Sequence, residues 1–180
     1  MFISRQTLAA ALALGSAMTQ TDAAEWKTHT YDADGFTADF SGEIDVDQME
    51  ARNATPQRLV GSTSYTQMSD DRSVGFIVAA NHFADGEAIN VSAVARRTMK
   101  SYACKDIVHD ARIDVGGATA REMRATGCFK GTKVGARFFK RDQWLYQVVY
   151  LIQKEQDRAD AEHFLASFKL VPVAAKGNGG

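Results

Sequence analysis

Short runs in which apolar and polar residues alternate, separated by brief turns, constrain the fold of this chain more than any other feature. A period of two residues is typical of strands that bury one face. Asp34-Gly35 lies between the first two runs and favours a tight hairpin, because such turns need positive φ angles. The runs span residues 26–31, 36–40, 58–68, 73–83, 107–115, 119–126, 133–141 and 144–152. Strands that follow one another across short turns predict a mainly antiparallel sheet.

Two segments instead have helical spacing. Val91, Val94, Ala95, Thr98 and Tyr102 predict a helix that Asn90 caps and that ends near Cys104. Ala161, Phe164, Leu165 and Phe168 form an apolar stripe on a closing helix that starts near Asp157. Two amphipathic helices flanking a mainly antiparallel sheet define an α+β layered domain. With 45% hydrophobic and 24% charged residues, the chain of 180 residues has the composition of one globular unit. We expect a single domain over residues 24–175 and a flexible tail over 176–180.

The first 23 residues have the organisation of a secretory signal peptide. Arg5 provides the positive start, residues 8–17 form an apolar stretch too short to span a bilayer, and Thr21 and Ala23 are the small residues before the cleavage point. The alternative is an N-terminal helix of the fold. Because no cysteine lies near the cleavage point, we expect no membrane anchor. The prediction is a protein of the periplasm or a secreted protein.

Cys104 and Cys128 are the only two cysteines. An even number of cysteines in an exported protein favours a disulfide, and we predict one bond between these two residues. Two buried thiols are the alternative. The chain has no Cys-x-x-Cys pair, so a thioredoxin-like redox centre is not supported.

No motif with catalytic or metal-binding spacing stands out. The histidines at 29, 82, 109 and 163 are far apart, without the helical spacing of a metal site. The carboxylate pairs Asp45/Asp47 and Asp70/Asp71 lie in polar segments that resemble loops. We therefore predict no catalytic residues, no metal and no cofactor. An enzyme around His82, His109 or Tyr65, and a metal module in the acidic N-terminal segment, are the alternatives.

Charge is distributed unevenly along the chain. Residues 25–52 contain 8 acidic and 2 basic residues, whereas residues 96–141 contain 12 basic and 4 acidic residues. If these segments occupy different faces, the basic face could attract an anionic partner. If the acidic and basic segments pair with each other inside the domain, their electrostatic fields cancel. The candidate basic binding surface consists of Arg96, Arg97, Lys100, Lys130, Lys133 and Arg137. No nucleic-acid motif is present, so we expect no nucleic-acid partner.

Four segments carry a resemblance to a known group. They are Tyr31-x-x-Asp34-Gly35-Phe36-x-Ala38-x-Phe40, residues 136–139 (Ala-Arg-Phe-Phe), residues 144–149 (Trp-Leu-Tyr-Gln-Val-Val) and Ala161-x-x-Phe164-Leu165-x-Ser167-Phe168-Lys169-Leu170. They resemble the pattern of small exported bacterial domains of the PsbP and Mog group. The resemblance implies an antiparallel sheet flanked by helices, and an accessory or binding role more often than catalysis. The matched residues are packing residues, and no functional residue is carried over.

Together these observations favour an exported, non-enzymatic accessory or binding domain that engages a protein or an anionic partner.

Overall fold

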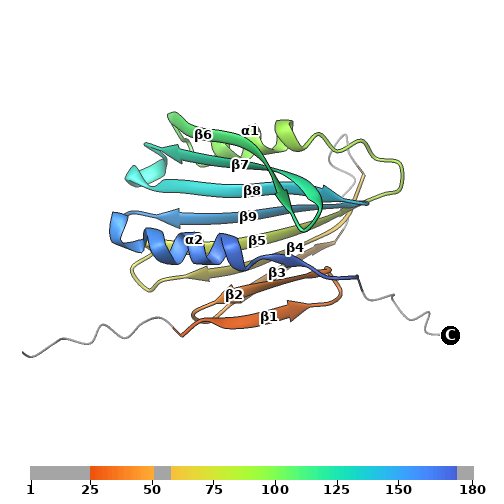
Figure 1. Ribbon diagram of the computed structural model, residues 1–180, viewed down its shortest axis with the longest axis horizontal. Helices are drawn as coiled ribbons and strands as arrows, with labels where there is room; N and C mark the ends of the chain where they lie inside the picture. Colours follow the sequence, from red (N-terminus) through yellow and green to blue (C-terminus); the bar gives the residue numbers. More distant parts are fainter. Residues whose placement is uncertain (1–24, 51–57, 174–180) are drawn as a thin grey trace, which may run out of the picture.

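The computed structural model describes residues 25–50 and 58–173 (Figure 1). The strands are β1 (Lys27–Tyr31), β2 (Phe36–Phe40), β3 (Asp45–Glu50), β4 (Leu59–Met68), β5 (Val74–Phe83), β6 (Asp106–Val115), β7 (Ala118–Thr126), β8 (Lys133–Arg141), β9 (Trp144–Ile152) and β10 (Lys169–Leu170). The α-helices are α1 (Val91–Ser101) and α2 (Arg158–Ser167), and 3₁₀ turns lie at Phe129–Gly131 and Glu155–Asp157.

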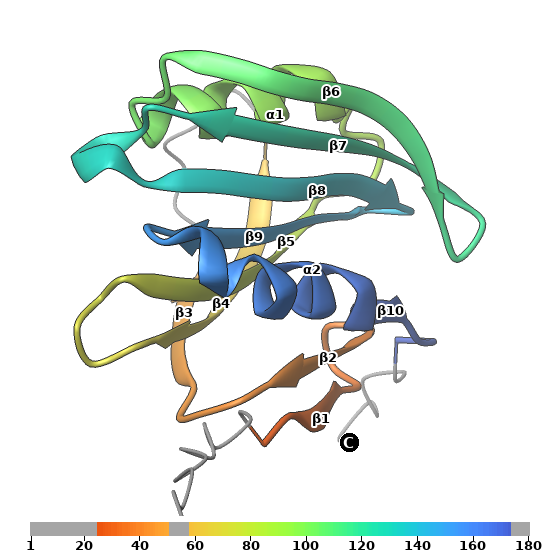
Figure 2. The same ribbon diagram turned by 60° about the vertical axis from the view of Figure 1, so that its left-hand side comes forward.

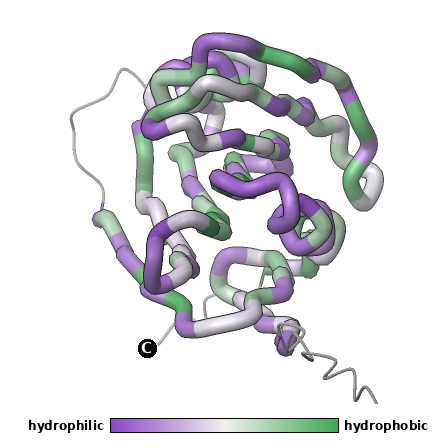
Figure 3. Tube along the Cα trace, turned by 90° about the vertical axis from the view of Figure 1, so that its left-hand side faces the viewer, coloured by the Kyte–Doolittle hydropathy of each residue, from purple (hydrophilic) through white to green (hydrophobic). Residues whose placement is uncertain are grey.

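Seven strands form the main sheet, in the order β3-β4-β5-β9-β8-β7-β6, and every neighbouring pair is antiparallel. After β5 the chain passes through α1 to the far edge of the sheet, and β6 to β9 then return strand by strand until β9 pairs with β5. A second sheet holds β1, β2 and β10. Hydrophobic and hydrophilic residues alternate along the strands (Figure 3), as expected for strands with one buried face.

The two helices cover opposite faces of the main sheet (Figure 2). On one face, Ala95 and Met99 of α1 pack on Phe138 of β8 and Met123 of β7. On the other face, α2 lies between the main sheet and the small sheet, within an aromatic core. The predicted α+β class is therefore confirmed, with one helix on each face of a mainly antiparallel sheet.

The turn between β1 and β2 attaches the small sheet to the main sheet. The Tyr65 hydroxyl of β4 donates to Asp34 Oδ2 at 2.7 Å, and the Tyr146 hydroxyl of β9 donates to the Asp34 carbonyl at 2.8 Å. Gly35 has φ +70°, and a Cβ added there would meet the guanidinium of Arg141. The positive φ therefore favours glycine at this turn, and a larger residue would also have to displace the Arg141 side chain.

The disulfide between Cys104 and Cys128 is present, as predicted. It joins the chain just after α1 to the chain just after β7, and the N–H of Phe129 donates to the carbonyl of Tyr102 at the same junction. The bond joins cysteines that are 24 positions apart, and the chain-entropy relation gives about 3.5 kcal/mol of stabilisation for a loop of this length.

Strand β3 differs from the sequence-based expectation. Asp45 and Asp47, assigned to a loop, belong to strand β3, in which every residue is exposed. Because β3 is an edge strand without a buried face, its sequence lacks the apolar alternation that identifies a strand. Pairing with β4 supplies the backbone hydrogen bonds that its composition does not predict. Edge charges of this kind also discourage pairing with another chain.

The signal peptide at 1–23 and the tail at 176–180 lie outside the described residues, so both stay predictions. Within residues 25–50 and 58–173, no helix combines the length and apolar character that a bilayer crossing requires.

All five tyrosines have a pKa above the ordinary value, chiefly because burial penalises the phenolate. Burial raises the pKa of Tyr146 to about 12, and at Tyr65 the hydrogen bond to Asp34 adds to the effect of burial. The folded state therefore holds these protons more tightly than the unfolded chain. Their contribution to stability is complete below pH 10 and is lost as the pH rises from 10 toward 12.

We expect the melting temperature to fall as the pH rises from about 10 to about 12. We also expect phenolate absorbance to appear at lower pH in denaturant than in the folded protein. Tyrosines that ionise at the same pH in both states would contradict this result.

Candidate functional site

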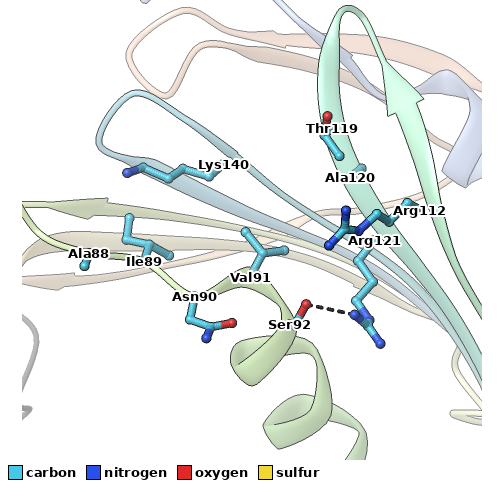
Figure 4. Close-up of a pocket in the computed structure, with 10 residues that line it drawn as sticks. All are labelled: Ala88, Ile89, Asn90, Val91, Ser92, Arg112, Thr119, Ala120, Arg121 and Lys140. Atoms are coloured by element: carbon cyan, nitrogen blue, oxygen red, sulfur yellow. Dashed lines mark hydrogen bonds between the residues drawn. The ribbon is translucent and has the colours of Figure 1, made fainter.

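A pocket of about 560 Å³ opens where α1 begins against β6, β7 and β8 (Figure 4). Its volume lies in the range of small-ligand sites. The charged side chains among its described lining residues are all cations, namely Arg112, Arg121 and Lys140. Ala88, Ile89, Asn90, Val91, Ser92, Thr119 and Ala120 complete the lining.

The hairpin register places two arginines directly opposite each other. Gly116 and Gly117 both have positive φ, and the β6–β7 ladder that begins beside them pairs Arg112 with Arg121. Like charges at directly opposite positions of a sheet are destabilising. Lys140 of β8 lies two positions from Phe138, which is opposite Arg121, and so projects from the same face. Three neighbouring strands thus direct cations to the face that α1 covers.

Arg121 is held in place by its neighbours. It donates to Ser92 Oγ in the first turn of α1 at 2.8 Å and forms an ion pair with Asp110. Its Nε is buried and has no hydrogen-bond partner among the described residues. Arg112 and Lys140 make no ion pair or side-chain hydrogen bond with any residue in 25–50 or 58–173. Figure 4 shows these two side chains on either side of Val91. Among the described residues, the pocket therefore has one cation held by neighbours, Arg121, and two without a side-chain partner, Arg112 and Lys140.

The start of α1 adds to the positive potential. Asn90 accepts a hydrogen bond from the N–H of Ala93, and the first turn of the helix contains no acidic residue. The positive end of the helix dipole is thus not offset by a nearby carboxylate on the helix itself. An anion here would meet two unpaired cations beside this helix end.

The six residues of the predicted basic surface do not form one surface. Arg96, Arg97 and Lys100 are exposed on α1, and Lys130 is exposed at the 3₁₀ turn. Lys133 forms an ion pair with Glu155. Arg137 is on the opposite face of the sheet, where it binds Glu122 at 2.8 Å and the carbonyl of Leu165. Because successive side chains of β8 point to opposite faces of the sheet, Arg137 projects away from the face that α1 covers.

The acidic and basic segments do not neutralise each other. In the described part of the chain, no ion pair joins residues 25–50 to residues 96–141. The acidic strand β3 and the basic strands β6 to β8 lie toward opposite edges of the main sheet. The basic residues that are paired, such as Arg121 with Asp110, use acids of their own region or of the C-terminal segment.

The histidines proposed for an enzyme are far apart. His82 of β5 stacks on Trp144, whereas His109 of β6 lies 3.6 Å from Glu122, and three strands separate β5 from β6. Tyr65 lies on β4, and its hydroxyl donates a hydrogen bond to Asp34. Among the described residues, no group of three or more His, Cys, Asp or Glu side chains could hold a metal ion.

Sequence reasoning missed Arg112, Arg121 and Lys140, although a signal was present. A two-residue Gly116-Gly117 turn fixes the register of the strands beside it, and that register places residue 112 opposite residue 121. The participation of α1 could not be found in this way, because it depends on a contact between elements distant in sequence.

The layered α+β fold that carries this pocket is that of PsbP-like domains, which confirms the expected fold. The solution structure of the cyanobacterial PsbP protein CyanoP from Synechocystis sp. PCC 6803 matches with a TM-score of 0.54 at 12% identity, covering 87% of this chain and 98% of that one. A crystal structure of a Pseudomonas aeruginosa protein of unknown function matches with a TM-score of 0.44 at 12% identity, covering 83% and 99%. No family model and no curated protein matches the sequence.

Proposed function

We propose that this protein is an exported, non-enzymatic accessory domain that binds an anionic group of its partner in the pocket beside the start of α1. The observation that carries the proposal is the convergence of Arg112, Arg121 and Lys140 on one pocket whose described lining contains no acid. Phosphate and carboxylate groups are the anions that arginine recognises best, because its planar guanidinium offers two parallel donors.

The repulsion between the opposed Arg112 and Arg121 supports a binding role, because a folded protein gains no stability from it. Opposing arginines in an antiparallel pair disfavour folding by a few tenths of a kcal/mol or more. Arg121 is compensated by Asp110 and Ser92, whereas Arg112 has no such partner in the described part of the chain. A bound anion would relieve the repulsion at Arg112 and would also meet Lys140. Export is supported by the signal-like N-terminus and by the disulfide, which forms readily outside the cytoplasm.

Calorimetric titration of the mature protein with pyrophosphate and with succinate at low ionic strength tests the anion site. We expect saturable binding that weakens as salt is added. Arg112→Gln should reduce the affinity about tenfold or more, since hydrogen bonds to charged groups contribute about 1.5–3 kcal/mol each. Comparison of the two anions distinguishes a phosphate site from a carboxylate site.

Arg97→Gln is the matched control, because it removes the same charge from an exposed position of α1 that does not line the pocket. It should leave the affinity within about twofold. If neither anion binds, or if both substitutions weaken binding equally, the pocket is not the anion site.

A further inference from the structure

A second pocket, of about 600 Å³, lies on the opposite face of the main sheet, where the β1–β2 turn meets β3, β4, β5 and β9. Its described lining contains two acids, Asp34 and Glu50, and neither lysine nor arginine. Gln48, Thr63, His82 and Trp144 add polar and aromatic groups. The described lining of this pocket is therefore opposite in charge to that of the pocket beside α1.

Asp34 is the central group. The residue is only 8% exposed, and its carboxylate accepts a hydrogen bond from the Tyr65 hydroxyl at 2.7 Å. No lysine, arginine or histidine nitrogen among the described residues lies within 4 Å of this carboxylate. Nearby Arg141 instead donates to the carbonyls of Gly35 and Val171. Buried carboxylates are ordinarily paired with a cation, and this one has no such partner within residues 25–50 and 58–173.

An aromatic surface forms part of the same pocket. The rings of Trp144 and His82 stack with centroids 4.6 Å apart and planes 13° apart, and Trp144 also stacks on Tyr146. Trp144 is only partly buried. Its indole face attracts cations more strongly than any other aromatic side chain. Val60 and Met49, which are 48% and 49% exposed, place apolar groups around the pocket.

We infer that this pocket binds a small organic cation, with Asp34 balancing its charge and Trp144 contacting its alkyl or ammonium groups. A buried carboxylate beside an indole is the pairing that recognises substituted ammonium ions, because these ions combine positive charge with an apolar surface. A metal ion fits less well, since the described residues offer no cluster of three metal ligands. The inference is independent of the anion site, which lies on the other face.

Calorimetric titration of the full mature protein with choline tests the inference, with its uncharged carbon isostere dimethylbutanol as the paired probe. We expect saturable binding of choline and at least about tenfold weaker binding of the isostere. Asp34→Asn should weaken choline binding about tenfold or more, while an asparagine oxygen still accepts the bond from Tyr65. Asp32→Asn removes the same charge from an exposed position in the same turn, outside the described lining, and should leave the affinity unchanged.

Trp144→Leu provides a second variant in case Asp34→Asn does not fold, and should reduce the affinity several-fold. Pyrophosphate titration of each variant reports separately on the anion site. Absence of choline binding to the wild-type protein would overturn the inference. Equal binding of choline and the isostere, or equal losses in Asp34→Asn and Asp32→Asn, would also overturn it.

Discussion

Replacing Phe164 with alanine is expected to lower the free energy of unfolding by about 4 kcal/mol, the typical loss for a buried phenylalanine. Phe164 of α2 is fully buried, and its ring lies 4.8 Å from that of Phe76 in the main sheet and 5.5 Å from that of Phe40 in the small sheet. The substitution would remove the contact that joins both sheets to the helix. For a domain of this size the melting temperature should fall by roughly 8–16 °C.

Phe129→Ala is the matched control for this effect. Phe129 is 66% exposed, so the same change of side chain should alter the stability by no more than about 0.5 kcal/mol. Urea denaturation of the two variants gives the comparison. Similar losses in both would mean that the aromatic cluster around α2 does not dominate the stability of the fold.

Glu122→Ala should cost about 3 kcal/mol, because it breaks a buried ionic network from its centre. Glu122 is 6% exposed; it accepts from Arg137 Nε at 2.8 Å and from Arg124 NH2 at 3.2 Å, and His109 lies 3.6 Å away. Its removal leaves Arg137 partly buried beside only a carbonyl of α2. Neighbouring cations would then lose their common counter-charge.

Two further variants test the reason for this loss, one separating charge from hydrogen bonding and the other serving as a control at a neighbouring acid. Glu122→Gln keeps an acceptor for Arg137 and should cost less than the alanine variant. Glu162→Ala removes the other acid that binds Arg124, at a more exposed position, and should cost about 1 kcal/mol or less. Urea unfolding curves measure all three, and a Glu162→Ala loss as large as that of Glu122→Ala would contradict a central role for Glu122.

The two pockets lie on opposite faces of the main sheet, and the charged residues of their described linings have opposite signs. The faces belong to one sheet, whose alternating side chains keep the two sets apart. In β8, Lys140 projects toward the α1 side, whereas Arg137 projects toward α2 and is neutralised by Glu122. A shift of one residue in the β8 register would exchange these roles. The charge pattern of the two faces therefore depends on the correct pairing of β7 with β8.

Much of the fold could be predicted from local patterns. The strand from Trp144 to Ile152 and the helix with Ala161 and Phe164 were found because their residues have the period of a strand or helix with a buried face. Strand β3 was missed because an edge strand without a buried face leaves no such period. The two residues of β10 were missed because pairing with β2, and not composition, makes them a strand.

The candidate sites were less accessible to sequence reasoning. The excess of basic residues between Arg96 and Arg141 could be read from the sequence. The six residues of the candidate basic binding surface, however, lie on different faces of the sheet or are already paired with acids. Arg112 and Arg121 could have been placed together from the Gly116-Gly117 turn. Nothing local indicated that Asp34 would be buried beside Tyr65, since 31 residues separate them.

The sequence by itself determined the class of this protein, because periodicity, turn residues and cysteine number act over short stretches of chain. It predicted an α+β domain with an antiparallel sheet, two amphipathic helices and a bond between Cys104 and Cys128. Only the tertiary structure decided which charges remain free. Whether Arg112 is repelled, or Asp34 is left without a cation, depends on strand register and on packing between distant elements, and neither is encoded in any single segment.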